Sequence, residues 1–166
     1  MAGGILDVAL RIGVTHADST AAMRRMIDNV RILVASPGYL AKRGLPEAPG
    51  DLVTHDLLRF GDAATPWRLI GKDGEASVPS RARMRADSGD ALNDWCLAGA
   101  GIALRSIVDV APDLAAGTLQ RVLPEWSGED APVVALFPAR TTMPRKTRVF
   151  LDAMEAYLAL VEASLR

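Results

Sequence analysis

The sequence predicts an α/β fold, in which strands and helices alternate along the chain around a largely parallel sheet. Three observations support this prediction. Ile5–Ile12 alternates apolar and polar residues with the period of two that is typical of a strand. Arg31–Ser36 contains an unbroken apolar run, which favours a strand buried on both faces. The apolar residues of the last segment repeat every three or four positions, the helical period: Phe150, Met154, Tyr157, Val161 and Leu165.

Proline and glycine residues mark where the first predicted elements end. Pro37 stops the buried strand and opens a helix, with Ser36 as the N-cap residue and Gly44 as the C-terminal stop. Further along, Trp67–Ile70 and Ala76–Ala86 flank a glycine-bounded turn. This pattern predicts a hairpin.

A second helix follows the predicted hairpin. Asp87 is its N-cap candidate, and Asp90 places another acidic group in the first turn. Gly99 and Gly101 end this helix, and Ile102–Leu104 reads as a short strand.

The remaining elements complete the alternation. Ser106 with Asp109 repeats the capping pattern and begins a third helix. Leu119–Leu123 and Val133–Phe137 are strand candidates, and the last helix begins near Pro144.

Composition limits the function classes. The 166 residues include 49% hydrophobic and 23% charged residues, which is typical of a globular protein. Nineteen basic and 20 acidic residues give a net charge of −1, which disfavours nucleic acid as a direct partner. One cysteine excludes an internal disulfide, and two histidines leave little material for a metal centre. No apolar run reaches the ~20 residues that span a bilayer and no secretion signal is visible, so we expect a cytoplasmic protein without a membrane partner.

The strongest candidate site is the corner formed by Asp87, Ser88 and Gly89, where a strand ends and a helix begins. Backbone N–H groups at a helix N-terminus attract a carboxylate or a phosphate. Ser88 adds a hydroxyl, and Gly89 lets a ligand approach the backbone closely. Asp87 counts against an anionic ligand because of its own negative charge. The alternative interpretation is a capped helix without a ligand.

Two further positions are weaker candidates. Arg11 and the Gly13–Thr15 turn lie at the C-terminal end of the first strand, where α/β sheets usually bind ligands. The favoured alternative for Arg11 is an ion pair with Asp7 or Asp18. Ser36 could contact a ligand, although it is sufficiently explained as a helix cap.

No catalytic constellation is visible. Cys96 shares the apolar helix face of Leu92 and Trp95, which predicts a buried, unreactive thiol. His16 and His55 have no metal-ligand spacing with each other or with the cysteine. We therefore expect no enzyme activity, no metal and no cofactor.

Several segments, taken in order, resemble the effector-binding domain of LysR-type transcriptional regulators. They are Asp7–Gly13, Asp18–Thr20, Leu33–Leu40, Trp67–Arg68, Asp87–Leu92, Ala98–Ala103 and Leu123–Trp126. None is specific alone, but the ordered set is similar to the family over nearly the whole chain, from about Asp7 to Tyr157.

The resemblance implies a two-lobed fold of the periplasmic-binding-protein type II-like class. Residues 1–36 and 131–166 would form a remnant of lobe one with the two crossing strands, and residues 37–130 would form lobe two. Effectors of the family bind in the cleft between lobes, which the corner at Asp87–Gly89 would face. Ile102, which lies within a matching segment, is also a candidate effector-binding residue.

Departures from the family pattern limit what the resemblance implies. The helix-turn-helix, the linker helix and the first elements of lobe one have no counterpart, so lobe one would be incomplete. After Ala103 the family usually continues with Leu-Leu-Pro, whereas Arg105 and Ser106 stand here.

The resulting functional hypothesis is a module that senses a small effector, an organic acid or an aromatic compound, for a homo-oligomeric regulator. DNA would be bound only through an absent N-terminal domain. The alternatives are an oligomerisation or interaction module and a non-functional truncated fragment.

Overall fold

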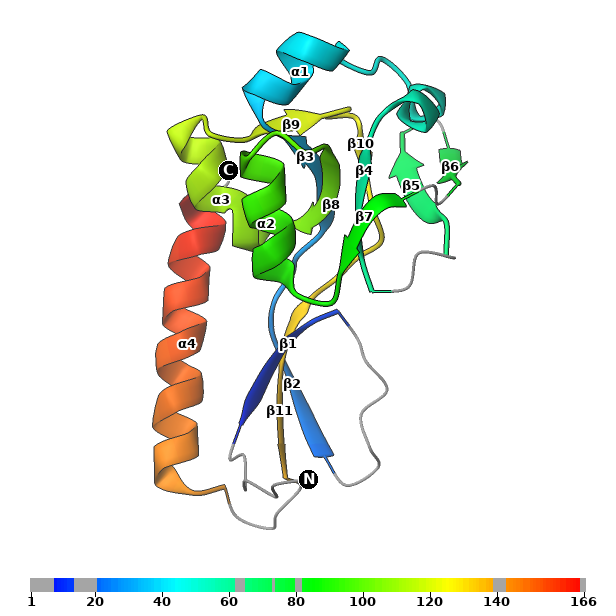
Figure 1. Ribbon diagram of the computed structural model, residues 1–166. Helices are drawn as coiled ribbons and strands as arrows, with labels where there is room; N and C mark the ends of the chain where they lie inside the picture. Colours follow the sequence, from blue (N-terminus) through cyan, green and yellow to red (C-terminus); the bar gives the residue numbers. More distant parts are fainter. Residues whose placement is uncertain are drawn as a thin grey trace. The chain divides into compact units, whose positions relative to one another are not determined.

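The computed structural model describes residues 8–13, 21–61, 65–72, 74–79, 82–138 and 143–164 (Figure 1). The chain forms two compact units. The larger unit contains residues 30–129, and the smaller unit contains residues 1–29 together with residues 130–166.

A five-stranded sheet in the order β7-β4-β8-β3-β9 forms the centre of the larger unit. Its strands are β3 (Arg31–Ala35), β4 (Leu57–Phe60), β7 (Ala82–Ala86), β8 (Ile102–Ser106) and β9 (Gln120–Val122). β4 runs parallel to β7 and β8, whereas β3 runs antiparallel to β8 and β9. The expectation of a largely parallel sheet is therefore wrong. The direction of β3 is set by pairing with strands far along the chain, which local alternation of elements does not reveal.

Helices and a second, smaller sheet cover this centre. The helices are α1 (Pro37–Arg43), the 3-10 helix η1 (Pro49–Thr54), α2 (Gly89–Leu97) and α3 (Ile107–Ala116). The smaller sheet is antiparallel and consists of β10 (Trp126–Ser127), β5 (Trp67–Gly71) and β6 (Gly74–Val78).

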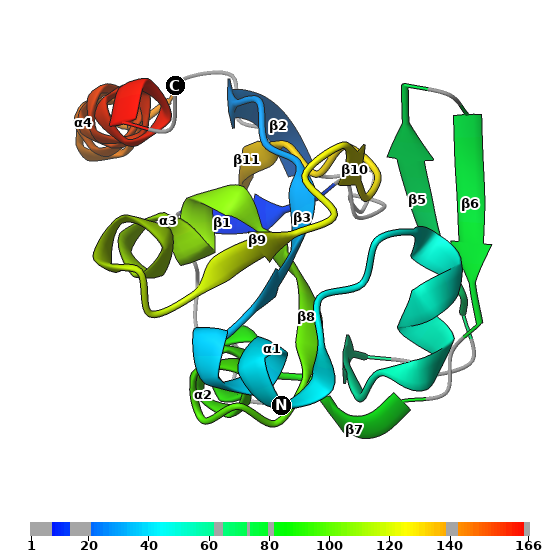
Figure 2. The same cartoon turned by 90° about the horizontal axis from the view of Figure 1, so that it is seen from above.

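β3 is buried on both faces, as its unbroken apolar run predicts. Ile32 and Val34 pack with side chains of α2 and α3 in one core cluster. Leu33 and Ala35 pack with side chains of α1, η1 and β5 in the other. In Figure 2, α2 and α3 accordingly lie on one side of β3 and β8, and β5 and β6 lie on the other.

The first helix confirms its predicted caps. Ser36 precedes α1, and its Oγ accepts a hydrogen bond from the Tyr39 amide at 3.4 Å. Gly44 follows the helix with a φ of 86°, a conformation that favours glycine, and its amide donates to the Leu40 carbonyl at 2.8 Å.

The predicted hairpin is partly wrong. β5 and β6 pair around the expected turn, but the arm assigned to Ala76–Ala86 consists of two strands. β6 ends at Val78, before Pro79, which has no backbone N–H to donate. β7 begins at Ala82 and pairs with β4 in the central sheet.

Within its described residues, the smaller unit consists of an antiparallel three-stranded sheet and one long helix. The strands are β1 (Ala9–Ile12), β2 (Ala21–Ile27) and β11 (Val133–Pro138), in the order β1-β11-β2. The helix, α4 (Arg145–Ser164), contacts β2. Arg24 of β2 pairs with Asp152 of α4 at 3.3 Å and also with Glu155.

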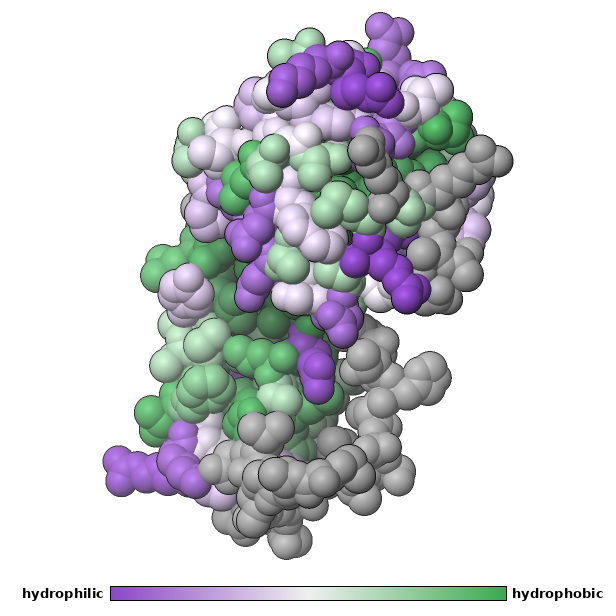
Figure 3. Space-filling view, in the orientation of Figure 1, coloured by the Kyte–Doolittle hydropathy of each residue, from purple (hydrophilic) through white to green (hydrophobic). Residues whose placement is uncertain are grey.

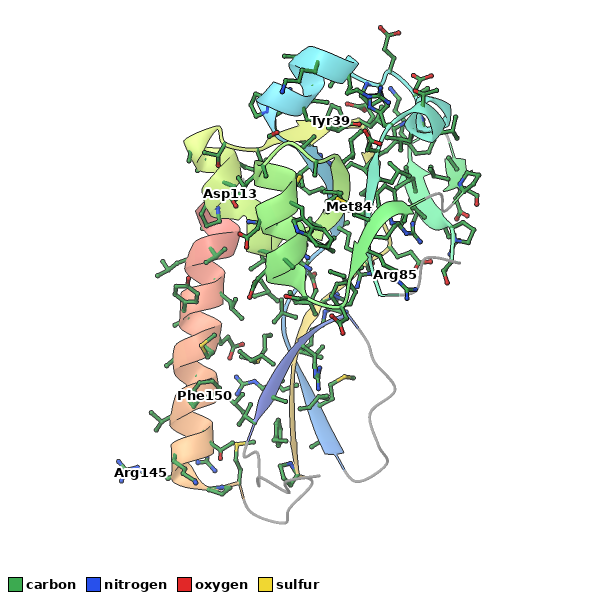
Figure 4. The ribbon with its side chains drawn as sticks, in the orientation of Figure 1. Tyr39, Met84, Arg85, Asp113, Arg145 and Phe150 are labelled. Atoms are coloured by element: carbon green, nitrogen blue, oxygen red, sulfur yellow. The ribbon has the colours of Figure 1, made fainter. Side chains whose placement is uncertain are left out.

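The apolar repeat predicted for the last helix is only partly buried in α4. Leu151 and Leu158 are the buried leucines of the helix, whereas Phe150 and Tyr157 are exposed. Figure 4 labels Phe150 on α4. The buried leucines each lie one residue after an aromatic residue of the predicted repeat, because the leucines and the aromatic residues share the same seven-residue spacing. Of the predicted positions, Leu165 lies outside the described residues.

Apolar residues also remain exposed elsewhere on the smaller unit. Figure 3 shows apolar side chains gathered over α4 and its neighbouring strands. The exposed large hydrophobic residues there are Leu10, Ile12, Met23, Val149, Phe150, Tyr157 and Leu160. None of the described helices, α4 included, is both long and apolar enough to cross a lipid bilayer.

Candidate functional site

The N-terminus of α2 forms the corner that the sequence singles out. Ser88 is the N-cap residue: its backbone is extended, and its Oγ accepts a hydrogen bond from the Ala91 amide at 3.4 Å. The assignment of the cap to Asp87 is therefore wrong. The helix begins at Gly89, so the side chain over the amide of its third residue comes from position 88. Asp87 lies exposed, one residue outside the helix, and Asp90 sits in the first turn as expected.

Arg105 lies directly behind this corner. A Cβ atom placed on Gly89 would be 3.1 Å from both terminal nitrogens of the Arg105 guanidinium. Arg105 is buried, and its Nη2 donates to a carboxylate oxygen of Asp109 at 3.2 Å. Burial raises the pKa of the Asp109 carboxyl group, and Arg105 partly opposes this shift. The corner thus combines a hydroxyl, the positive end of a helix and a guanidinium that pairs with Asp109, whereas the carboxylates of Asp87 and Asp90 oppose a negative charge on a ligand.

Ser36 lies away from this corner. Its Oγ would be 3.5 Å from a Cβ atom on Gly99, which follows the C-terminal end of α2. Because α2 has nine residues, its two ends are about 14 Å apart. Ser36 instead borders a separate hollow of about 470 Å³ with Lys42 and Thr118.

Arg11 and Gly13 belong to the smaller unit. Arg11 is exposed on β1. Gly13 is buried with a φ of 85°, which favours glycine, and its amide donates to the Pro132 carbonyl at 2.9 Å. The structure does not describe Thr15 of the predicted turn, nor Asp7 and Asp18, the two alternative ion-pair partners of Arg11.

Ile102 is fully buried in β8. It packs in the core cluster of Leu33 and Leu57, and its amide donates to the Asp56 carbonyl at 2.9 Å. This packing leaves Ile102 no surface that a ligand could contact.

A cavity in the larger unit was not anticipated from the sequence. It has a volume of about 800 Å³ and is lined by the end of β4, by β5 and β6, and by residues of β3 and β8. Its lining includes three arginines, Arg31, Arg59 and Arg68, together with the apolar side chains of Trp67 and Leu104.

Arg59 is the buried arginine of this cavity, with 3% of its surface exposed. Its guanidinium carbon lies 5.0 Å from the centre of the Trp67 ring, within cation–π range. Its Nη2 donates to the Thr65 carbonyl. The sequence does contain a signal for a buried arginine, since Arg59 interrupts the apolar run Leu57–Phe60. Charged residues are rarely buried, so a charge in such a run marks an unusual position.

The edge of the cavity adjoins the strand that leads to the α2 corner. Gly61 lines the cavity, and its amide donates to the Ala86 carbonyl at 2.8 Å. Asp87 follows Ala86 directly, so the cavity and the α2 corner lie at the same end of the five-stranded sheet. Residues 87–89 themselves do not line the cavity.

Cys96 confirms the prediction of a buried thiol. It is fully buried, and its Sγ donates to the Val34 carbonyl at 3.4 Å. Burial raises the pKa of the Cys96 thiol to about 12. A thiol in this environment is protonated at neutral pH and does not act as a nucleophile.

His55 has a structural position. Its Nδ1 shares a hydrogen bond of 3.2 Å with the Tyr39 hydroxyl, which also accepts from the Asp56 amide at 2.9 Å. Burial lowers the pKa of His55, and the nearby Arg43 lowers it further. Within the described ranges, no group of three or more His, Cys, Asp or Glu residues could hold a metal ion.

The comparisons with known proteins point to one family. The family described as the LysR substrate binding domain matches residues 1–159. The HTH-type transcriptional regulator DmlR of Escherichia coli (strain K12) is 34% identical over 157 residues, which are 93% of this chain and 50% of DmlR. PtxR of Pseudomonas aeruginosa is 32% identical over 162 residues, covering 95% of this chain and 51% of PtxR. The chain thus spans about half the length of the curated relatives that it matches.

Solved structures give the same result. The CrgA regulatory domain of Neisseria meningitidis superposes with a TM-score of 0.77 at 32% identity, covering 92% of this chain and 76% of that one. Full-length AphB of Vibrio cholerae, a virulence activator, gives 0.75 at 30% identity, covering 91% of this chain and 51% of AphB. These regulatory domains confirm the predicted α/β class, the periplasmic-binding-protein type II-like fold. The family and its relatives are transcriptional regulators and not enzymes. The chain belongs to the LysR substrate-binding domain family.

Proposed function

We propose that this chain senses a small effector for a LysR-type transcriptional regulator and binds an organic acid or an aromatic compound at the N-terminus of α2. The family match over residues 1–159 is the observation that carries the proposal. The corner adds support, because the Ser88 hydroxyl and the Arg105 guanidinium lie at the positive end of one helix.

The proposed mechanism is a population shift. Residues 37–130 would act as lobe two, with residues 1–36 and 131–166 contributing to lobe one. A ligand that contacts one arrangement of the lobes more favourably increases its share of the population. In the whole protein this shift would reach DNA through a helix-turn-helix domain, as the names of the relatives suggest. The proposal places such a homo-oligomeric regulator in the cytoplasm, with its DNA.

A ligand screen followed by one substitution tests the proposal. Organic acids and aromatic compounds are screened for those that raise the melting temperature of the chain, and calorimetry then measures the affinity of each hit. Ser88→Leu should weaken binding at least about tenfold, because it removes the hydroxyl and fills the corner.

The control variant is Asp51→Ala. Asp51 accepts hydrogen bonds from the amides of Glu47 and Ala48, both at 3.0 Å, so this variant also loses local backbone bonds, but away from the corner. Its affinity should match the wild type. A screen without hits, or equal affinities for Ser88→Leu and wild type, would contradict the proposal.

A second candidate function is self-association. The exposed apolar side chains of α4, among them Val149, Tyr157 and Leu160, favour it. Light scattering distinguishes this role from sensing alone: an associating module shows a mass that rises with concentration, and replacing Tyr157 and Leu160 with serine should lower that mass.

A further inference from the structure

A hollow beside η1 and the end of β6 shares no described lining residue with the cavity beside β4 or with the α2 corner. We propose that it is a second binding site, and that its ligand is a small uncharged carbonyl compound whose oxygen accepts a hydrogen bond from His55. The hollow has a volume of about 340 Å³, within the range of small-molecule sites, about 300–1,000 Å³. Its described lining residues all belong to the larger unit: Leu52, Val53, His55, Leu57 and Pro79.

The contacts of His55 determine which of its ring nitrogens carries the proton. The Tyr39 hydroxyl accepts a hydrogen bond from the Asp56 amide at 2.9 Å, so its own proton is donated to Nδ1 of His55, 3.2 Å away. Burial and Arg43 lower the pKa of His55, which favours the neutral ring at pH 7. A neutral imidazole that accepts at Nδ1 carries its proton on Nε2.

The Nε2–H group of His55 is therefore the donor that remains for a ligand. Among the described residues, the ring makes no hydrogen bond other than the one to Tyr39. Tyr39 is not among the described lining residues, whereas His55 is, so the bond at Nδ1 is made outside the hollow. A carbonyl oxygen only accepts hydrogen bonds and so matches this single donor.

The charges around His55 favour an uncharged ligand. None of the described lining residues is a lysine, an arginine or an acid. Arg43 is already engaged, since it donates to the Thr54 carbonyl at 2.7 Å and lies 3.9 Å from a carboxylate oxygen of Asp56. Asp51 and Asp56 both act electrostatically on His55. An anion in the hollow would lose water and meet these two carboxylates, whereas a neutral carbonyl compound would not bring a charge with it.

Apolar side chains form the rest of the hollow. Leu52 and Leu57 belong to the core cluster of the larger unit and are 0% and 1% exposed. Val53 and Pro79 are exposed, which leaves the hollow open to solvent beside them. The lining therefore favours a compact apolar body with one polar atom, because apolar surface gains from leaving water.

Acetophenone is the probe for the first test. The chain has two histidines, and His16→Gln identifies which ring signals in a long-range ¹⁵N–¹H spectrum belong to His55. Without ligand, the spectrum should show a protonated Nε2 and an unprotonated Nδ1. Titration with acetophenone should shift the Nε2 signal and the amides of Val53 and Leu57. A ring protonated at Nδ1, or unshifted signals of the hollow, would overturn the proposal.

Two compounds of nearly the same shape test the class of ligand. Benzoate replaces the methyl group of acetophenone with a charged oxygen and should bind at least about tenfold more weakly, because the hollow offers no cation. Ethylbenzene replaces the carbonyl group with a methylene and should bind about 3- to 10-fold more weakly, because it cannot accept from His55. Equal affinity of acetophenone and either compound would refute the assigned chemistry.

One substitution fills the hollow, and a matched substitution is its control. Val53→Phe enlarges a lining side chain that is 57% exposed and should reduce acetophenone affinity at least about tenfold. Val149→Phe makes the same change at a valine of the smaller unit that is 60% exposed, and should leave the affinity unchanged. Undiminished binding by Val53→Phe would contradict the site.

A further variant separates this site from the proposed effector corner. Ser88→Leu should leave the acetophenone shifts at Val53 and Leu57 unchanged. If acetophenone instead shifts only the amides of Ser88 and Gly89, the hollow is not a binding site for it, while the proposed function stands.

Discussion

The two units of this chain bury their apolar residues to very different degrees. In the larger unit, β3 lies between two core clusters, and the side chains of Ile32 and Leu33 are 0% exposed. In the smaller unit, Leu160 is 72% and Val149 is 60% exposed. The larger unit therefore has the more complete core, and it also contains the cavity beside β4. This difference teaches that a sheet covered on both faces completes its own packing, whereas a sheet with one helix leaves apolar surface available for other contacts.

The largest expected effect tests this difference directly. Leu33→Ala should destabilise the chain by about 2–5 kcal/mol, because it leaves a cavity in a closed core. Leu160→Ala, the matched change in the smaller unit, should alter stability by less than about 0.5 kcal/mol. Urea unfolding of both variants measures the contrast, and equal losses would show that the units are packed alike.

Hydrogen exchange should show the same contrast without mutation. Amides of β3 and β8 should open only with global unfolding, whereas those of β1 and α4 should exchange at least about tenfold faster. The reason is the poorer cover of the smaller unit. Uniformly slow exchange in both units would mean that the exposed apolar residues are covered in solution, for example by self-association.

The cap of α2 should have a smaller effect. Ser88→Ala removes the hydrogen bond to the Ala91 amide and should cost about 1 kcal/mol, whereas Asp87→Ala should cost much less. Thermal unfolding of the two variants reports the difference. If Asp87→Ala lost more stability than Ser88→Ala, Asp87 rather than Ser88 would be the residue that caps α2.

The smallest expected effect is the pH dependence caused by His55. Burial and Arg43 lower the pKa of His55 in the folded chain below its usual value near 6.5, so the unfolded chain takes up this proton first. Stability should therefore fall as the pH drops below about 6.5 toward the folded pKa, and this dependence should weaken in His55→Gln. Melting temperatures between about pH 7.5 and 5.5 measure it. Identical slopes for the two proteins would mean that His55 does not cause the change.

Local signals in the sequence were sufficient for some elements. The apolar run of β3, the Ser36 cap and the Gly44 stop depend on neighbours within a few residues, and each is confirmed. β2 and β4 were missed because Ala21–Ile27 lacks alternation and Leu57–Phe60 is short. β7 was assigned to the hairpin because its true partner, β4, lies more than 20 residues earlier in the sequence.

The candidate site shows the same limit. The α2 corner was visible because strand, serine and glycine are consecutive in the sequence. Arg105 was noticed as a departure from the family, but its contact with Gly89 depends on how β8 packs against α2. The Arg59–Trp67 contact joins two strands from different sheets, so it appears only in the folded chain.

The buried position of Cys96 has a practical consequence for labelling the protein. It is the only cysteine in the sequence, and its thiol is enclosed in the larger unit. Thiol reagents should therefore leave the folded wild-type chain unmodified and should label a cysteine introduced at an exposed position, such as Lys42→Cys, selectively. The rate at which Cys96 itself is modified, measured by mass spectrometry, would then report the rate at which the core around α2 opens.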